Sequence, residues 1–202
     1  MDSKPTGRRL LRLVRNRGVL SAGDAARQGI HSQELTRAVH AGLVERTSRG
    51  KYRLAQRSVT ENHALVIAAE AVPRGVICLL SALAFHGIGT QLPFEVWIAI
   101  ERGSRTPSLR YPPLRVASFS GAAFDQGIEI HRLEKQQVRI YGIAKTVADL
   151  FKYRKKVGLD VALEALREVW RDRRVTIDDI DHFARICRVE RVMRPYMEAL
   201  VA

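Results

Sequence analysis

Two short helical segments joined by a tight glycine turn constrain the N-terminal part of this chain more than any other feature. Ser21 is a typical N-cap residue with an aspartate three residues later, a variant of the capping box, and predicts a helix over residues 22–28. Gly29 is expected to end this helix in the left-handed conformation, and Ser32 is expected to cap a second helix over residues 33–41. This arrangement is typical of a helix–turn–helix.

The same segment carries most of the positive charge of the chain. The 202 residues have a net charge of +13, from 34 Lys and Arg against 21 Asp and Glu. Residues 1–57 hold 13 of the basic residues and 4 of the acidic ones, a net of +9, whereas residues 58–202 have 21 against 17, a net of +4. Charge concentrated on one small module indicates a polyanionic partner, and the helix–turn–helix suits the major groove of DNA.

The second helix of the pair separates an apolar face from a polar face. Leu35, Ala38 and Val39 follow helical spacing and are expected to pack on the preceding helices. The opposite face carries four side chains that can bond to base edges, namely Gln33, Thr36, Arg37 and His40. An ordinary solvated helix face is the alternative interpretation. The capped helix before it and the hairpin after it favour the reading of DNA bases.

A short hairpin is predicted from residues 43–47 and 51–54 around the turn Ser48-Arg49-Gly50, where Gly50 suits the left-handed position. The alternation in 51–54 (KYRL) predicts one packing face and one basic face. The side chains expected to contact DNA phosphates, from a first helix at 8–17 and from this hairpin, are Arg8, Arg12, Arg46, Arg49, Lys51 and Arg53. The whole module is therefore predicted to be a winged helix.

Residues 58–202 are predicted to form a second domain, a small mixed sheet followed by C-terminal helices, so that the fold class is α+β with a division after residue 57. Strands are expected at 76–79, 94–100, 114–118, 128–133 and 138–143. Helices are expected at 61–72, 81–86, 145–156, 160–171, 177–188 and 189–200.

Several features of the sequence indicate where in the cell the protein is located. No apolar run approaches the roughly 20 residues that span a bilayer, and the first residues lack the apolar core of a signal peptide. Cys78 and Cys187 lie in apolar contexts and are expected to be buried free thiols. We therefore expect a cytoplasmic protein without membrane contact.

No pattern of catalytic or metal-binding residues stands out, so we predict neither an enzyme nor a cofactor or metal. Glu129 and His131 would share one side of a strand close to Asp125, as in a magnesium-dependent nuclease, but the usual lysine is missing and a solvated strand face is the simpler interpretation. A basic run at a helix C-terminus is explained by the helix dipole or, alternatively, by a second phosphate, RNA or partner contact. This run comprises Lys152, Arg154, Lys155 and Lys156.

The chain resembles the AbiEi family over most of its length: a winged helix is followed by LSALAFHGIGTQLPFEVWIAIERGSR (80–105), a short sheet and GIAKTVADLF (142–151). Members of this family are antitoxins and transcriptional regulators of type IV toxin–antitoxin systems. The resemblance implies a winged helix that binds the double-stranded promoter of its own operon, with inverted repeats as the expected operator. It also implies a second domain that counteracts a nucleotidyltransferase-like toxin.

Two other functions fit the sequence. One is a winged-helix regulator whose second domain senses a ligand or mediates oligomerisation. The other, less favoured, is a nuclease guided to DNA by the winged helix. A ligand-sized apolar pocket would favour the first, and converging carboxylates around a metal would favour the second.

Overall fold

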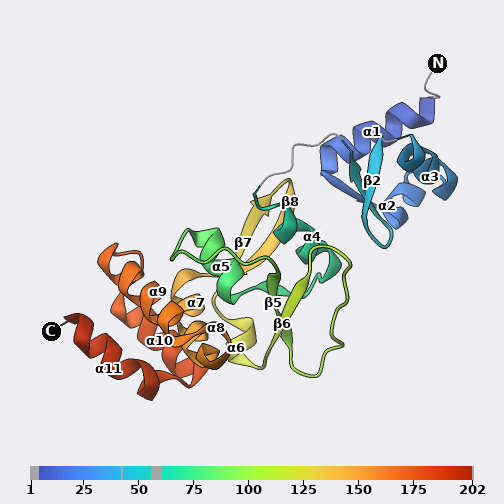
Figure 1. Ribbon diagram of the computed structural model, residues 1–202. Coiled ribbons are helices and arrows are strands. Elements are labelled where there is room, and N and C mark those ends of the chain that lie inside the picture. The colour runs from blue at the N-terminus through green and yellow to red at the C-terminus, as the bar shows by residue number, and fades with distance from the viewer. Residues whose placement is uncertain (1–4, 42, 56–60, 202) are drawn as a thin grey trace.

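The computed structural model describes residues 5–41, 43–55 and 61–201. The N-terminal part is three helices around a small antiparallel sheet of strand order β1-β3-β2 (Figure 1). Its elements are α1 (Pro5–Arg17), β1 (Val19–Ser21), α2 (Ala22–Arg27), α3 (Ser32–His40), β2 (Val44–Ser48) and β3 (Lys51–Leu54). A hydrophobic cluster built only from residues 10–54 holds these elements together.

The start of α2 forms as its sequence predicts. The backbone N–H of Asp24 donates to Ser21 Oγ over 2.9 Å, and Ser21 Oγ donates back to the Asp24 carboxylate over 2.8 Å. Gly29 adopts a φ of +72° after the helix, which favours glycine. The predicted cap at Ser32 is wrong, because the chain becomes helical one residue earlier and the extended His31 is the N-cap.

The rest of the chain forms a five-stranded mixed sheet of order β6-β5-β4-β8-β7, in which the β5–β6 and β4–β8 pairs are parallel and the others antiparallel. Its elements are α4 (His63–Ala71), β4 (Val76–Ile77), α5 (Leu79–His86), β5 (Val96–Glu101), β6 (Leu114–Phe119), α6 (Ala122–Asp125), β7 (Ile128–Leu133), β8 (Gln136–Tyr141), α7 (Ile143–Lys152), α8 (Arg154–Val157), α9 (Leu159–Arg171), α10 (Ile177–Cys187) and α11 (Glu190–Val201). The predicted α+β class, with helices, mixed sheet and C-terminal helices in that order, is confirmed.

Side chains alternate between the two faces of this sheet, as strand geometry requires. Ile98 of β5 packs in a cluster with Leu65 and Val66 of α4, whereas its neighbours Trp97 and Ala99 belong to a larger cluster with the C-terminal helices. The helix α4 therefore covers one face, and α5, α7, α9 and α10 contribute to the core on the other.

Some predicted boundaries shift for local reasons. The apolar run 76–79 was expected to be one strand, but Leu79 has a φ of +47° and begins α5, which leaves a strand of two residues. The helix expected at 145–156 is interrupted at Tyr153, whose hydroxyl donates to the Ser118 carbonyl over 2.7 Å and ties this point to β6.

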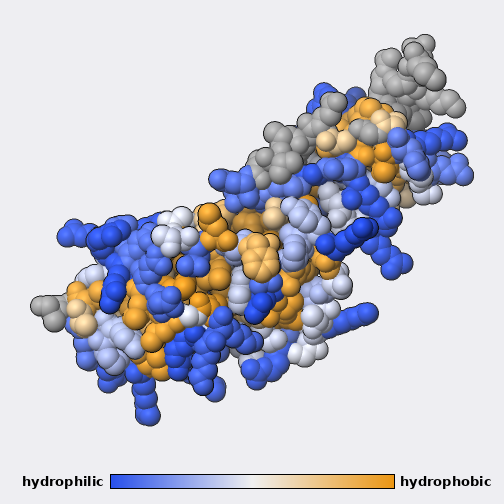
Figure 2. All heavy atoms as spheres, viewed as in Figure 1, coloured by the Kyte–Doolittle hydropathy of each residue, from blue (hydrophilic) through white to orange (hydrophobic). Residues whose placement is uncertain are grey.

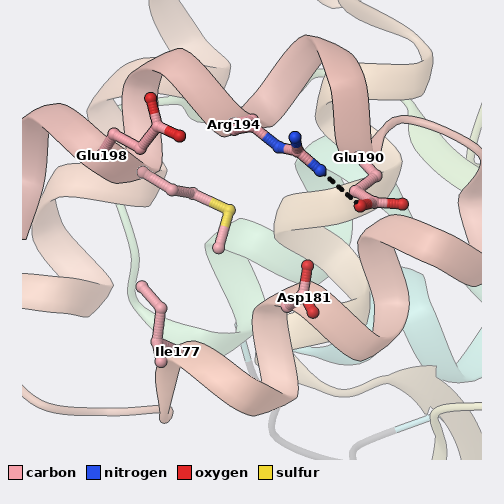
Figure 3. A pocket seen from close by; sticks show the side chains of 6 residues that line it. Ile177, Asp181, Glu190, Arg194 and Glu198 are labelled. Atoms are coloured by element: carbon pink, nitrogen blue, oxygen red, sulfur yellow. Dashed lines mark hydrogen bonds and ion pairs between the residues drawn. The ribbon is translucent and has the colours of Figure 1, made fainter.

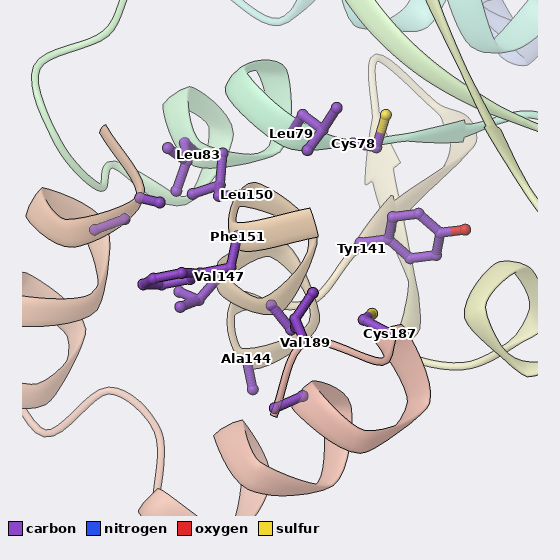
Figure 4. Packing of buried hydrophobic residues seen from close by; sticks show 14 of the residues in the cluster. Cys78, Leu79, Leu83, Tyr141, Ala144, Val147, Leu150, Phe151, Cys187 and Val189 are labelled. Carbon is purple, nitrogen blue, oxygen red and sulfur yellow. The ribbon is translucent and has the colours of Figure 1, made fainter. Parts of the chain in front are cut away.

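An ion pair lies inside the larger cluster, where Figure 4 shows α7 surrounded by side chains such as Leu83, Cys187 and Val189. Lys145 and Asp149 are completely buried and lie one helical turn apart, with 2.5 Å between Nζ and Oδ2. The ammonium of Lys145 also lies 4.0 Å from the centre of the Tyr141 ring. Both ions are therefore held by specific partners inside an apolar core.

The two cysteines are buried free thiols, as expected. Cys187 Sγ donates to the second oxygen of Asp149 over 3.2 Å, so that each oxygen of this carboxylate has a partner. Burial raises the pKa of Asp149, and the neighbouring Lys145 opposes that rise. Burial also raises the pKa of Cys187 to about 12, which keeps this thiol protonated.

Removing the cation of this pair should destabilise the fold strongly. Lys145→Met leaves Asp149 buried without its counter-ion, and we expect a loss of about 3–5 kcal/mol in the free energy of unfolding. The double variant Lys145→Met, Asp149→Leu should recover most of this loss, because neither charge is then buried. Urea denaturation measures both values, and a double variant as unstable as the single one would contradict this role of the pair.

Candidate nucleic-acid interface

The polar stripe predicted on α3 is exposed along its whole length. Its inner side is anchored by Leu35 and Ala38, which are buried in the N-terminal cluster with Val39 packed beside them. The four outward residues are Gln33, Thr36, Arg37 and His40, and each is exposed. The structure thus presents four hydrogen-bonding side chains on one rigid helix face, the geometry that direct reading of base edges needs.

The exposed arginines of the hairpin gather at its turn. Arg46 and Arg49 are both exposed, and Arg46 Nε donates to the Ser48 carbonyl at the end of the same strand over 3.3 Å. Gly50 has the expected left-handed backbone, with a φ of +74°. Arg12 is exposed on α1, whereas the side chain of Arg8 lies outside the described part of the structure. Arg12, Arg46 and Arg49 are therefore available to a ligand.

The predicted basic face of β3 is not an exposed surface. Arg53 is only 7% exposed, is paired with Glu45, and donates to His63 Nδ1 over 2.7 Å. Lys51 is half-buried, and its Nζ donates to the Glu70 carbonyl over 2.6 Å. The expectation that both side chains contact phosphates from a free face was wrong for Arg53. Lys51 is bonded within the protein.

The position of β3 explains this correction. The strand pairs with β1 on one edge and with β2 on the other, so it is the centre of its sheet. Tyr52 and Leu54 pack on the N-terminal cluster, as predicted, while α4 lies against the opposite face. The sequence shows neither that 19–21 pairs with β3 nor that a helix of the second part covers the hairpin.

Further polar contacts attach the second part of the chain to the winged helix. Thr47 Oγ1 donates to Glu70 Oε2 over 3.5 Å, beside the Lys51 contact. At the β7–β8 turn, Lys135 Nζ and Gln136 Nε2 donate over 2.8 Å to backbone carbonyls at the end of α1. These bonds satisfy carbonyls that a helix C-terminus leaves without partners. They also fix the orientation of the hairpin relative to the larger sheet.

The basic run around α8 lies at a distance from α3 (Figure 1). Lys152, Lys155 and Lys156 are exposed, and Arg154 is half-buried and donates to the Phe151 carbonyl near the end of α7 over 2.8 Å. Arg154 thus acts as the helix-dipole interpretation expects. A phosphate contact of the three lysines stays a prediction.

The residues considered for a metal-dependent enzyme make a simple surface pair. His131 Nε2 lies 2.9 Å from Glu129 Oε2 on one side of β7. Within the described ranges, no group of three or more His, Cys, Asp or Glu side chains could hold a metal ion. These same ranges contain no helix with the length and apolar character that crossing a bilayer requires.

A pocket between α10 and α11 is a poor match to a DNA phosphate (Figure 3). Its volume is about 220 Å³, and its walls carry three carboxylates, those of Asp181, Glu190 and Glu198. The one arginine there, Arg194, is paired with Glu190 over 2.9 Å. This size is below the usual range of small-molecule sites, so the pocket gives little support to a ligand sensor.

Comparisons with known proteins point to the same segment as the geometry. Residues 8–55 match the family model described as transcriptional regulator, AbiEi antitoxin. The resemblance predicted from the sequence is thereby confirmed for the winged helix. The fold also resembles the crystal structure of the RV2827C protein from Mycobacterium tuberculosis, with a TM-score of 0.64 and 10% identity over 90% of this chain and 72% of that chain. At this identity the likeness shows the fold alone, and no curated protein matches the chain.

The contact between hairpin and α4 should make stability depend on pH through Glu70. Burial raises the pKa of this carboxyl to about 7, although Lys51 opposes the shift. The folded protein therefore binds a proton that the unfolded chain releases above its ordinary pKa of 4.5, and stability falls as pH rises through the window from 4.5 to 7. Relative to Glu70→Gln, which cannot titrate, the wild type should lose about 2–3 kcal/mol between pH 5 and pH 8. Urea denaturation of both proteins at the two pH values measures this, and parallel pH dependences would refute it.

Proposed function

We propose that this protein is a sequence-specific DNA-binding transcriptional regulator that represses its own promoter. The observation that carries this function is the exposed stripe of Gln33, Thr36, Arg37 and His40 on a helix held rigidly by the N-terminal core. The match of residues 8–55 to a family of transcriptional regulators supports it. We place the DNA-binding domain at 1–57 and the second domain at 58–202.

In this function α3 lies in the major groove. Arg37 would pair with a guanine and Gln33 with an adenine, the pairings that their donor and acceptor atoms favour. Arg12, Arg46 and Arg49 would contact phosphates, which position the protein without reading sequence. Lys51 and Arg53 hold the hairpin on α4 and are not assigned a DNA contact.

The recognition helix can be tested at one residue. Arg37→Ala should weaken binding to a duplex of the protein's own promoter by roughly 1–3 kcal/mol, and binding to a scrambled duplex much less, because a bidentate arginine–guanine pair discriminates by about that amount. Competition binding at one fixed salt concentration measures both losses. Since Arg37 is exposed, a melting curve should show an intact fold. Equal losses on both duplexes would make Arg37 a phosphate contact, and no loss on either would remove α3 as the reading helix.

We also propose that the second domain counteracts a nucleotidyltransferase-like toxin encoded beside this gene. The match of residues 8–55 to a family of antitoxins supports this role. This role needs no catalysis by the chain itself.

Co-expression separates this role from DNA binding. The neighbouring gene product should arrest growth, and co-expression of the full chain from an unrelated promoter should relieve the arrest. Arg37→Ala should relieve it equally well, because the second domain is unchanged. Persistent arrest with the wild-type chain present would contradict the antitoxin role and leave the regulator unaffected.

A further inference from the structure

A long connection between β5 and β6, residues 102–113, lies beside the wing and encloses a cleft with it. The cleft has a volume of about 680 Å³. Arg46 and Arg49 of the hairpin line one wall, Arg110 and Tyr111 of the connection line another, and His63 of α4 also borders it. The two parts of the chain thus build one concave surface.

This surface is strongly basic. The connection contains Arg102, Arg105 and Arg110, all exposed, and residues 102–124 include no acidic side chain. Within the described part of the chain, neither Arg46 nor Arg49 nor Arg110 forms an ion pair with a carboxylate. The carboxylate of Glu45 on the cleft wall is already paired with Arg53. Figure 2 shows hydrophilic side chains projecting along this side of the molecule.

His63 borders the cleft with one ring nitrogen that has no partner among the described residues. The side chain is only 5% exposed, and its Nε2 has no hydrogen-bond partner among the described residues. The other ring nitrogen, Nδ1, lies 2.7 Å from an Arg53 guanidinium nitrogen and 3.1 Å from Glu134 Oε2. A buried polar nitrogen without a partner costs about 1–3 kcal/mol, which a hydrogen bond to a ligand in the cleft would offset.

We propose that this cleft binds backbone phosphates of DNA, so that the connection 102–113 is a second DNA-contacting element that acts together with the wing. This inference rests on the proposed function and extends its DNA-binding surface beyond residues 1–57. Small-molecule sites are mostly apolar, whereas this wall carries several arginines and is open to solvent. In the view of Figure 1, α3, the hairpin turn and the connection follow one another along one edge, which a duplex can follow.

The attachment of the hairpin to α4 makes the cleft a fixed site. Lys51 and Thr47 bond to Glu70, and Arg53 bonds to His63, so the wall formed by the wing does not depend on the connection itself. Replacing exposed arginines of the connection should therefore leave the wing in place.

The test uses the full chain with the double variant Arg105→Ala, Arg110→Ala. Its matched control is Arg167→Ala, Arg191→Ala, which removes two exposed arginines from α9 and α11, far from the wing in Figure 1. Binding of a promoter duplex and of a scrambled duplex is measured by fluorescence anisotropy between about 50 and 200 mM salt. Each lost phosphate contact should make the slope of log K against log salt less negative by about 0.9.

We expect the loop variant to lose about 1–2 in this slope and roughly tenfold or more in affinity on both duplexes, while the control matches the wild type. Melting curves check that both variants remain folded. A wild-type slope in the loop variant would overturn the inference and leave the proposed function intact. Failure of the wild-type chain to bind any duplex would instead refute the proposed function.

A free phosphorylated molecule is the other source of the same ligand chemistry. Inorganic pyrophosphate at constant ionic strength is the probe. If it raises the melting temperature of the wild type and not of the loop variant, while the DNA slopes of the two proteins agree, the cleft binds free phosphates and the DNA contact is wrong.

Discussion

The contact between β3 and α4 determines what the DNA-facing side of this molecule can do. The strand β3 lies in the centre of its sheet. Its side chains alternate between the core of the winged helix and the surface of α4. Arg53 is thereby removed from solvent and Lys51 half-buried, and both have internal partners. The hairpin cannot change its direction without breaking these bonds, so the arginines at its turn keep a fixed relation to the larger sheet.

Polar contacts join the two parts of the chain on both sides of their interface. On one side the hairpin bonds to α4, and on the other the β7–β8 turn bonds to the end of α1. Apolar interfaces tolerate small sliding movements, whereas hydrogen bonds and ion pairs require particular angles and distances. Buried charges such as Arg53 also demand partners, so this interface favours one orientation over its alternatives. Glu70 connects that orientation to pH because it titrates within the contact.

Local patterns predicted most of the fold, and contacts distant in sequence account for the errors. The cap at Ser21, the left-handed Gly50 and the strand 128–133 depend on neighbouring residues, and they formed as predicted. The exposed stripe on α3 was predictable for the same reason, since helical periodicity alone places its residues on one face. The burial of Arg53 was not, because the alternation in KYRL assigns a side chain to a face and says nothing of what covers that face. The cleft that residues 108–111 share with the wing was also not predictable, since only the tertiary structure places this connection beside the wing.

The net charge of +9 on residues 1–57 overstates how many cations of this module are free to contact DNA. A cation strengthens binding to phosphates only if it is free to exchange its counter-ions for them. Arg53 is neutralised by Glu45, and Lys51 is directed to a carbonyl, so both contribute to the position of the wing rather than to its contacts. Arg110 belongs to the less basic part of the chain, yet it forms no ion pair with a described residue and lines the same cleft as Arg49. The electrostatic surface offered to DNA is therefore defined by which cations lack internal partners, and it crosses the boundary between the two parts of the chain.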